Sequence, residues 1–316
     1  MYHIKHKCML NVSNKHKVIS IDGGGIKGIV AIKVLMAIEE EMQELLTNNV
    51  SLVAGTSTGA IIAASVAKGI PMGVLLDKYI AFGEDVFKDS FSRRVSNLFG
   101  LRGSKYKRED LSKLIYKELG TGSIGSMYND LLIPSYNMTK ARPEIFTSKS
   151  SIDIGSAVIA SASAPTYFKP MIINGSEYID GGIIANNPSM LAYTEIKSKY
   201  NSVASDISIL SIGCGSSPKN YNNSSKWPTY KWIKPLLDIA VNSDMSIVHN
   251  QLVKVYNSIK TPENYIRINE NITKSMNSNM DDASRYNINT LIEFGDYVVA
   301  KNSKRIKEAA AMMSKR

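Results

Sequence analysis

Residues 51–67 are SLVAGTSTGAIIAASVA, and this stretch decides the fold. Residues 51–54 predict a short buried strand, which breaks at Gly55-Thr-Ser-Thr-Gly59. Ala60–Ala67 then carries apolar residues on every side, which predicts a buried helix. A serine on such a tight strand-to-helix turn projects its hydroxyl from the sheet, and the glycines beside it let the backbone turn without a clash. The stretch therefore predicts a nucleophile, Ser57, although the five-residue pattern alone also arises by chance.

Strands and helices alternate on both sides of this stretch. Further strands are predicted at 17–22, 131–136, 177–180 and 207–212, and further helices at 29–46, 155–163, 188–200, 232–257 and from 288 onward. Residues 82–125 show only weak periodicity, and 219–230 predict a loop of low complexity. Alternation of this kind is typical of a mainly parallel sheet covered by helices on both faces. We expect one domain of this class with a helical C-terminal extension.

The composition is that of an ordinary globular protein, with 44 % hydrophobic and 21 % charged residues among 316. No apolar stretch approaches the roughly 20 residues that a membrane-spanning helix needs. The first 17 residues are basic but have no continuous apolar segment, so no secretory signal peptide is predicted. Cys8 and Cys214 are far apart and predict free thiols in a reducing compartment. We expect a cytoplasmic protein.

The net charge of +10 is unevenly distributed. Residues 93–108 hold six basic side chains and no acidic one: Arg93, Arg94, Arg102, Lys105, Lys107 and Arg108. Residues 301–316 hold six more against one acid, Glu308. Such segments can be solvated surface, or they can bind an anionic membrane or a nucleic acid. Because no zinc spacing, RNA-binding motif or helix-turn-helix pattern is present, the membrane is the better functional interpretation and a nucleic-acid partner is not expected.

A second glycine-rich motif, Asp22-Gly-Gly-Gly-Ile-Lys-Gly28, follows the first predicted strand and has two interpretations. Its Gly-x-Gly-x-x-Gly spacing fits a dinucleotide site, but such a site needs an acid at the end of the next strand, where this chain has Gly55 and Ser57. The alternative is an oxyanion hole, in which backbone N–H groups near a helix start bind an oxygen that becomes negative. The missing acid favours the oxyanion hole.

Asp180 stands at a predicted strand end and is followed by Gly181 and Gly182, a position suited to an active-site carboxylate or simply to a turn. Histidine is scarce: three of the four histidines precede the first strand, and His249 falls in a predicted helix. A Ser-His-Asp triad would need a histidine on a late loop. A Ser57–Asp180 dyad is the consistent alternative, with the carboxylate as general base.

Together these motifs resemble the patatin-like phospholipase family. Residues 22–28 are similar to its oxyanion motif, in which the position of Lys27 is more often arginine. Gly55–Gly59 is similar to its nucleophile motif, and Asp180–Gly182 to its catalytic-aspartate motif. Two shorter segments, Ser161–Pro165 and Asn186–Pro188, also match family patterns. The resemblance covers residues 17–215, and the last hundred residues have no comparable match.

The resemblance implies an α/β/α sandwich that cleaves fatty-acyl esters of membrane phospholipids through a covalent acyl-serine. Ser57 would attack and Asp180 would serve as base, with no metal and no cofactor. The expected oxyanion site comprises Gly23, Gly24, Gly25, Lys27 and Gly28. The residues expected to support these motifs are Asp22, Gly55, Gly59, Gly181 and Gly182. Lysine at 27 keeps the charge of the usual arginine but lacks its planar fork.

We expect a basic N-terminal arm (1–16), a catalytic core (17–215) and a mostly helical part (216–316) packed on the same domain. The family includes bacterial effectors, both toxins delivered into host cells and antiphage phospholipases switched on by cyclic nucleotides. The resemblance thus implies a cytoplasmic enzyme that associates peripherally with anionic membrane when active, with a cyclic nucleotide as a candidate activator. A patatin-like fold that binds or senses without turnover is the alternative. The sequence does not specify an oligomeric state.

Overall fold

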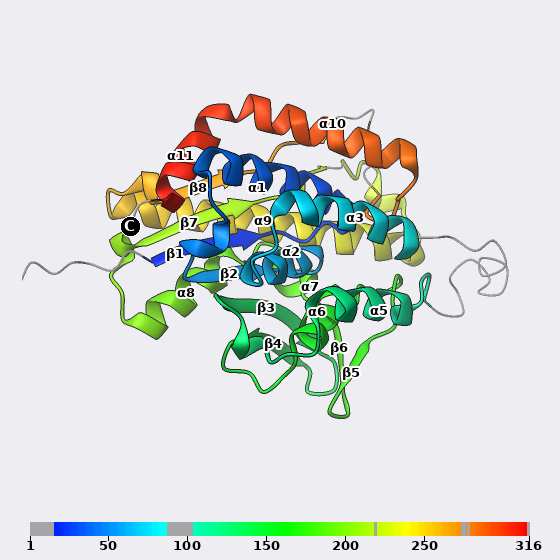
Figure 1. The fold of residues 1–316 in the computed structure, drawn as a ribbon. Coiled ribbons are helices and arrows are strands. Elements are labelled where there is room, and N and C mark those ends of the chain that lie inside the picture. Colours follow the sequence, from blue (N-terminus) through cyan, green and yellow to red (C-terminus); the bar gives the residue numbers. More distant parts are fainter. Residues whose placement is uncertain (1–15, 87–103, 218–219, 273–275, 277–278, 315–316) are drawn as a thin grey trace, which may run out of the picture.

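The computed structural model describes residues 16–86, 104–217, 220–272, 276 and 279–314. Its strands form one sheet in the order β5-β6-β3-β2-β1-β7-β8, with β4 paired to β3 (Figure 1). The strands are β1 (His16–Ile21), β2 (Leu52–Gly55), β3 (Asp130–Asn137), β4 (Arg142–Thr147), β5 (Met171–Ile173), β6 (Ser176–Asp180), β7 (Ile207–Ile212) and β8 (Tyr265–Ile268). The run from β3 to β8 is parallel, whereas β4, β5 and β6 pair antiparallel at one end.

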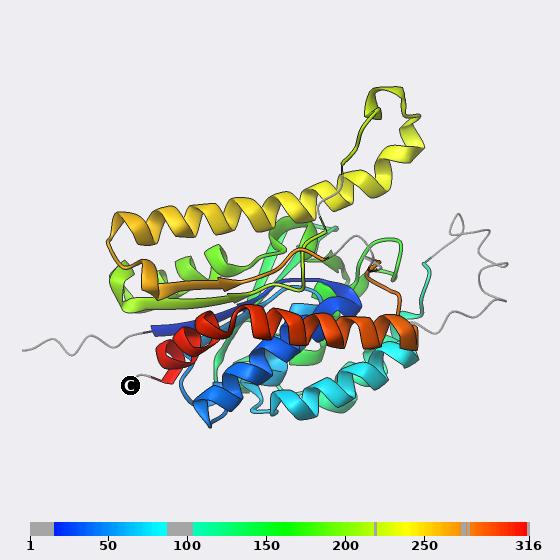
Figure 2. The ribbon, with the colours of Figure 1, turned by 90° about the horizontal axis from the view of Figure 1, so that it is seen from above.

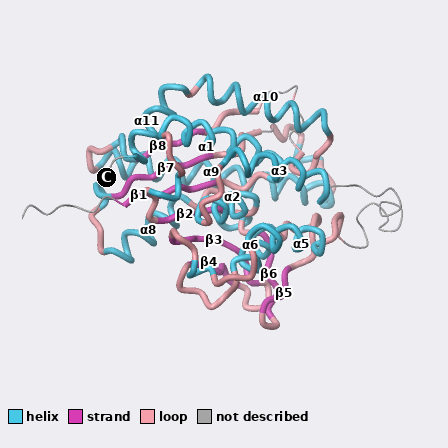
Figure 3. Tube along the Cα trace, in the orientation of Figure 1, coloured by secondary structure: helices cyan, strands magenta, loops and turns pink. Residues whose placement is uncertain are grey.

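Helices cover both faces of this sheet (Figures 2 and 3). The first face carries α1 (Gly28–Met42), α2 (Thr58–Ala67), α3 (Met72–Val86), α5 (Arg108–Leu119), α6 (Ile154–Ala162), α10 (Arg285–Lys301) and α11 (Ser303–Ser314). The second face carries α8 (Ser189–Tyr200) and α9 (Ile233–Ser258), and α7 (Gly182–Ala185) contacts α9. The expected α/β/α sandwich with a mainly parallel sheet is confirmed.

Alternation along the strands explains the two cores. Val18 of β1 belongs to the core beneath α8 and α9, whereas its neighbour Ile19 belongs to the core beneath α1 and α2. Successive strand side chains point to opposite faces, so a strand that is apolar at every position is covered on both sides. Strand β7 (ISILSI) is buried at all six positions, its two serines included, because both faces of the sheet are covered there.

The C-terminal residues belong to every layer of the sandwich. Helices α10 and α11 pack on α1, α9 covers the opposite face, and β8 extends the sheet beside β7. The predicted helices of this part are present, but β8 was not predicted, and neither were β4 and β5. Residues 82–125 contain the end of α3 and the whole of α5 despite their weak periodicity. Among the described residues, no helix is long and apolar enough to cross a membrane.

Several expectations fall on residues outside the described part. These are the arm 1–15 with Cys8, and the basic residues Arg93, Arg94 and Arg102. Lys105, Lys107 and Arg108 of the same basic segment are described: Lys105 pairs with Asp281, and Arg108 donates a hydrogen bond of 2.6 Å to the carbonyl oxygen of Pro170.

Candidate active site

Ser57 lies in the turn between β2 and α2, at the carboxyl edge of the parallel strands. Its backbone is strained, with φ 55° and ψ −122°, a conformation rare for residues other than glycine. The turn is closed so tightly that a Cβ on Gly55 would lie 2.1 Å from the carbonyl oxygen of Gly59. The N–H of Ser57 donates a hydrogen bond of 2.9 Å to Oγ of Ser161 in α6, which helps hold the strained residue.

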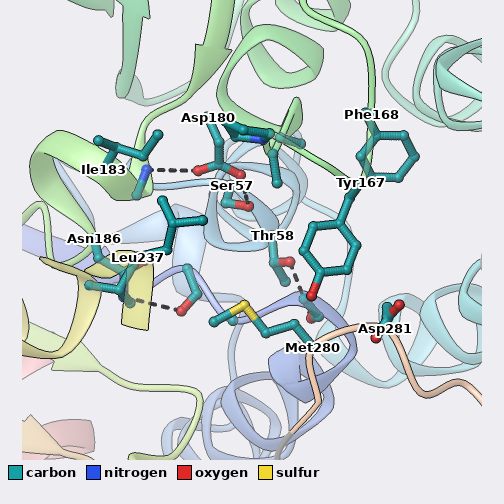
Figure 4. A pocket seen from close by; sticks show the side chains of 18 of the residues that line it. Ser57, Thr58, Tyr167, Phe168, Asp180, Ile183, Asn186, Leu237, Met280 and Asp281 are labelled. Carbon is teal, nitrogen blue, oxygen red and sulfur yellow. Dashed lines mark hydrogen bonds between the residues drawn. The ribbon is translucent and has the colours of Figure 1, made fainter. Parts of the chain in front are cut away.

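Asp180 ends β6, and its side chain meets Ser57 directly (Figure 4). The Ser57 hydroxyl donates to Oδ2 of Asp180 over 2.6 Å, and the N–H of Gly182 donates to Oδ1 over 2.7 Å. Burial raises the pKa of Asp180 to about 6, while the hydrogen bonds from Ser57 and Gly182 act in the opposite direction. The site therefore holds a carboxylate of moderate basicity against a serine hydroxyl, which is the geometry a general base needs.

The glycine loop lies beside this pair, between β1 and α1. Gly25 has φ +60°, and a Cβ there would lie 2.1 Å from the carbonyl oxygen of Met280. Gly24 and Gly25 open a 3-10 turn (Gly25–Lys27), so neither N–H has a partner within the turn. Neither donates a hydrogen bond anywhere in the described part of the chain. Two residues that line the same cavity as Ser57 thus have backbone N–H groups that donate to no described residue.

The other residues of the predicted oxyanion site, Gly23, Lys27 and Gly28, have different contacts. The N–H of Gly23 donates to the carbonyl oxygen of Asn186 over 3.1 Å, although Gly23 itself lines the cavity. Lys27 and Gly28 are buried but do not line the described cavity. A Cβ on Gly28 would lie 2.4 Å from Cγ2 of Thr58, so Gly28 allows α1 and α2 to approach closely.

Asp22 does not face the cavity. Its carboxylate is fully buried and forms an ion pair with Arg267 of β8, with Nη2 2.6 Å from Oδ2. Gly181 turns the chain after Asp180, where a Cβ would lie 2.1 Å from the carbonyl oxygen of Pro134. Sequence reasoning did not identify Arg267, since a single arginine in a short apolar run carries no signal of its partner.

The Ser57–Asp180 pair opens into a cavity of about 280 Å³ with mainly apolar walls. Segments far apart in the sequence supply the walls, among them Ile61, Leu111, Tyr167, Phe168, Ile183, Leu237, Val241 and Met280. The contributions from α9 and from the segment before α10 were not predicted, because the sequence pattern gives no sign of which surface the C-terminal part covers. An apolar cleft at a nucleophile suits an acyl chain better than a polar substrate.

His249 lies away from this site. It belongs to α9, and its Nδ1 lies 3.1 Å from the hydroxyl of Tyr265 in β8. His16, at the start of β1, stacks on Tyr200. Within the described ranges, no three His, Cys, Asp or Glu side chains are close enough together to hold a metal ion.

Several known proteins are similar to most of this chain. The family model described as patatin-like phospholipase matches residues 19–193. Patatin-like protein 2 of Arabidopsis thaliana is 27 % identical, over 92 % of this chain and 84 % of that protein. A protein named probable inactive patatin-3-Kuras 1, of Solanum tuberosum, is also 27 % identical, over 90 % of this chain and 86 % of its own length. The crystal structure of VipD from Legionella pneumophila aligns with 91 % of this chain and 67 % of that chain, with 15 % identity and a TM-score of 0.39.

Proposed function

The chain belongs to the patatin-like phospholipase family, and we propose that it hydrolyses fatty-acyl esters of membrane phospholipids, as a phospholipase A, through a Ser57–Asp180 dyad. The observation that carries the proposal is the 2.6 Å hydrogen bond from the Ser57 hydroxyl to the buried carboxylate of Asp180. A serine becomes a nucleophile when an adjacent base accepts its proton, and Asp180 is the base in contact with it.

The reaction would proceed in two halves. Asp180 accepts the hydroxyl proton as Ser57 Oγ attacks the ester carbonyl, and the resulting oxyanion is bound by the N–H groups of Gly24 and Gly25. Collapse of this intermediate breaks the ester bond, and Asp180 returns the proton to the leaving alcohol oxygen. Water then attacks the acyl-serine with Asp180 again as base, which releases the fatty acid and restores Ser57. Apart from the ester and this water molecule, the steps use groups of this chain.

The walls of the cavity support a lipid substrate. Phe168, Ile183 and Leu237 provide apolar surface next to the dyad, where a fatty-acyl chain loses its contact with water on binding. The same walls do not favour a hydrophilic ester, because they offer few partners for its polar groups. The apolar surface next to Ser57 therefore supports the proposed substrate class.

We propose in addition that the enzyme acts in the cytoplasm and associates peripherally with anionic membrane when active. The division into an arm (1–16), a core (17–215) and a C-terminal part (216–316) of the same domain is likewise a proposal. Activation by a cyclic nucleotide is also a proposal, and it rests on the family resemblance. Adding candidate cyclic nucleotides to the vesicle assay below tests it.

The test is fatty-acid release from mixed phospholipid vesicles by wild type, Ser57→Ala and Asp180→Ala, together with labelling by a fluorophosphonate probe. Ser65→Ala is a matched control, since the hydroxyl of this buried serine of α2 donates to the carbonyl oxygen of Ile61, one turn earlier in the same helix. Release and labelling by wild type and Ser65→Ala, but not by Ser57→Ala, are expected. If wild type neither labels nor releases fatty acid, with or without nucleotides, the chain is a catalytically silent binding or sensor protein.

A further inference from the structure

The segment that leads into α9, together with the first turn of that helix, stands clear of the body of the molecule (Figure 2). We call residues 220–236 the aromatic projection. Three of its rings pack on one another: the centroids of Tyr221 and Trp227 are 5.9 Å apart, and those of Trp227 and Trp232 are 5.4 Å apart. Tyr230 is 71 % exposed and Leu236 55 % exposed. Large apolar side chains thus face solvent at a protruding site, which is unusual unless a partner covers them.

The projection is basic. Residues 220–236 contain three lysines and no acidic residue, and Lys226 and Lys231 are exposed. The first acid after it, Asp238, accepts a hydrogen bond of 3.4 Å from the Tyr221 hydroxyl at the base of the projection. The projection therefore presents positive charge and aromatic rings together, with no negative charge among them.

The projection is continuous with the candidate active site. Leu237 and Val241, in the first turns of α9, line the cavity of Ser57, and Ile239 between them is 39 % exposed. On α7, which contacts α9, Ile183 also lines the cavity and is 36 % exposed. An apolar surface thus runs from the cavity mouth onto the projection.

We infer that the aromatic projection is the surface by which the protein docks on an anionic lipid–water interface. Tryptophan and tyrosine rings are favoured at the level of lipid headgroups, and lysines beside them are attracted to anionic lipid. A protein partner is a poorer fit, because lysine is depleted at protein–protein interfaces. The inference rests on the proposed function at one point only, namely that the lipid of this membrane is the substrate of the enzyme. Docking there places the cavity mouth at the membrane, where an acyl chain can pass to Ser57.

The chain offers an internal probe of this surface. Its two tryptophans are Trp227 and Trp232, so all tryptophan fluorescence comes from the projection. The experiment adds vesicles of phosphatidylcholine with phosphatidylglycerol, or of phosphatidylcholine alone, to the full chain carrying Ser57→Ala, which prevents hydrolysis. We expect a blue shift of the emission with the anionic vesicles, and quenching when brominated lipid is included. If the protein sediments with anionic vesicles but its emission shows neither the blue shift nor the quenching, the inference is overturned.

Paired variants test the two parts of the surface. Lys226→Glu with Lys231→Glu should weaken vesicle binding about tenfold or more, because two attractive charges become repulsive. Tyr230→Ser with Leu236→Ser should weaken it about tenfold through lost apolar burial. The matched controls lie elsewhere: Lys304→Glu with Lys307→Glu on α11, and Tyr128→Ser with Val203→Ser at the amino edge of the sheet, all exposed. Equal losses in the projection variants and their controls would also overturn the inference.

Hydrolysis of a water-soluble ester by wild type separates this inference from the proposed function. Without ester hydrolysis but with the fluorescence response, the proposed function fails and the docking surface stands. With ester hydrolysis, and with vesicle binding unchanged by the projection variants, only the docking surface fails. An emission shift that depends on protein concentration in the absence of lipid would identify an interface between copies of this chain instead, and would overturn docking on lipid.

Discussion

Arg267 of β8 donates a hydrogen bond to each carboxylate oxygen of Asp22, from Nη1 to Oδ1 over 3.2 Å and from Nη2 to Oδ2 over 2.6 Å. The pair joins the C-terminal part of the chain to the first residue of the glycine loop, 245 positions earlier. Burial raises the pKa of Asp22, and the guanidinium of Arg267 opposes that shift. The glycine loop, which carries the N–H groups of Gly24 and Gly25, is thus held by an ion pair with the last strand of the chain.

Arg267→Met should destabilise the protein by about 3–5 kcal/mol, because it leaves the charge of Asp22 buried without its partner. Chemical denaturation at pH 7 measures this change in the free energy of unfolding. Arg305→Met is the control, since Arg305 is exposed and, among the residues that the structure describes, donates a hydrogen bond only to the carbonyl oxygen of Arg267. Asp22→Asn combined with Arg267→Met should recover part of the loss. Similar stability of the Arg267 and Arg305 variants would show that the ion pair does not anchor the loop.

The sequence predicted the centre of the fold well because the signals there are local. The strand before Gly55 and the helix after Gly59 follow from apolar runs broken by glycines, and the close contacts at these glycines explain why no larger residue would fit. Ser57 and Asp180 were singled out from such turns. Their hydrogen bond is a contact across 123 positions, which only the folded chain displays.

What the sequence did not predict depends on long-range contacts or weak patterns. Arg267 has no local mark of a partner 245 positions away, and β8 is a run of only four residues. Helix α5 buries Leu111, Ile115 and Leu119 at four-residue spacing, but this apolar face belongs to a single helix of twelve residues within the stretch 82–125, whose periodicity as a whole is weak. The aromatic projection was predicted as a loop (219–230) followed by the start of a helix (from 232), and its exposure was not predicted because it follows from how α9 packs.

Ester hydrolysis should fall as the pH falls through about 6, because only the deprotonated carboxylate of Asp180 can accept the Ser57 proton and its pKa is raised to about 6. The measurement is kcat/KM for a water-soluble ester from pH 4.5 to 8.5, which avoids pH effects on vesicles. Each point is followed by return to pH 8 to exclude irreversible unfolding. A rate that stays constant down to pH 4.5 would contradict a base with this pKa.

Gly25→Ala should lower kcat by about 10²–10³, because a side chain at φ +60° and 2.1 Å from the Met280 carbonyl oxygen must shift the loop and its N–H groups. Gly175→Ala is a matched control: Gly175 also has positive φ, at 76°, but no atom lies within 4 Å of its added Cβ. The control should lose about 1–2 kcal/mol of stability while kcat is retained. Equal loss of kcat in both variants would show that backbone strain, not the loop geometry, lowers the rate.

Asp180→Asn should abolish activity and yet raise stability at neutral pH by about 1–3 kcal/mol, because it removes a carboxylate whose ionisation is disfavoured by burial. The pKa of Asp180 is about 6 when folded and 3.8 in its ordinary state, so its protonation stabilises the fold fully below pH 3.8. That contribution is lost as the pH rises through 6. The gain from asparagine should therefore be small at pH 4 and largest above pH 7, as measured by denaturation across this range.

Asp244 provides a control for this prediction. Its pKa is raised to about 6 by the same cause, and it accepts a hydrogen bond from the Asn187 N–H. Asp244→Asn should therefore show a similar stability profile while hydrolysis persists. An Asp180→Asn protein that is less stable than wild type at pH 7.5 would mean that the hydrogen bonds of the carboxylate outweigh the cost of its burial.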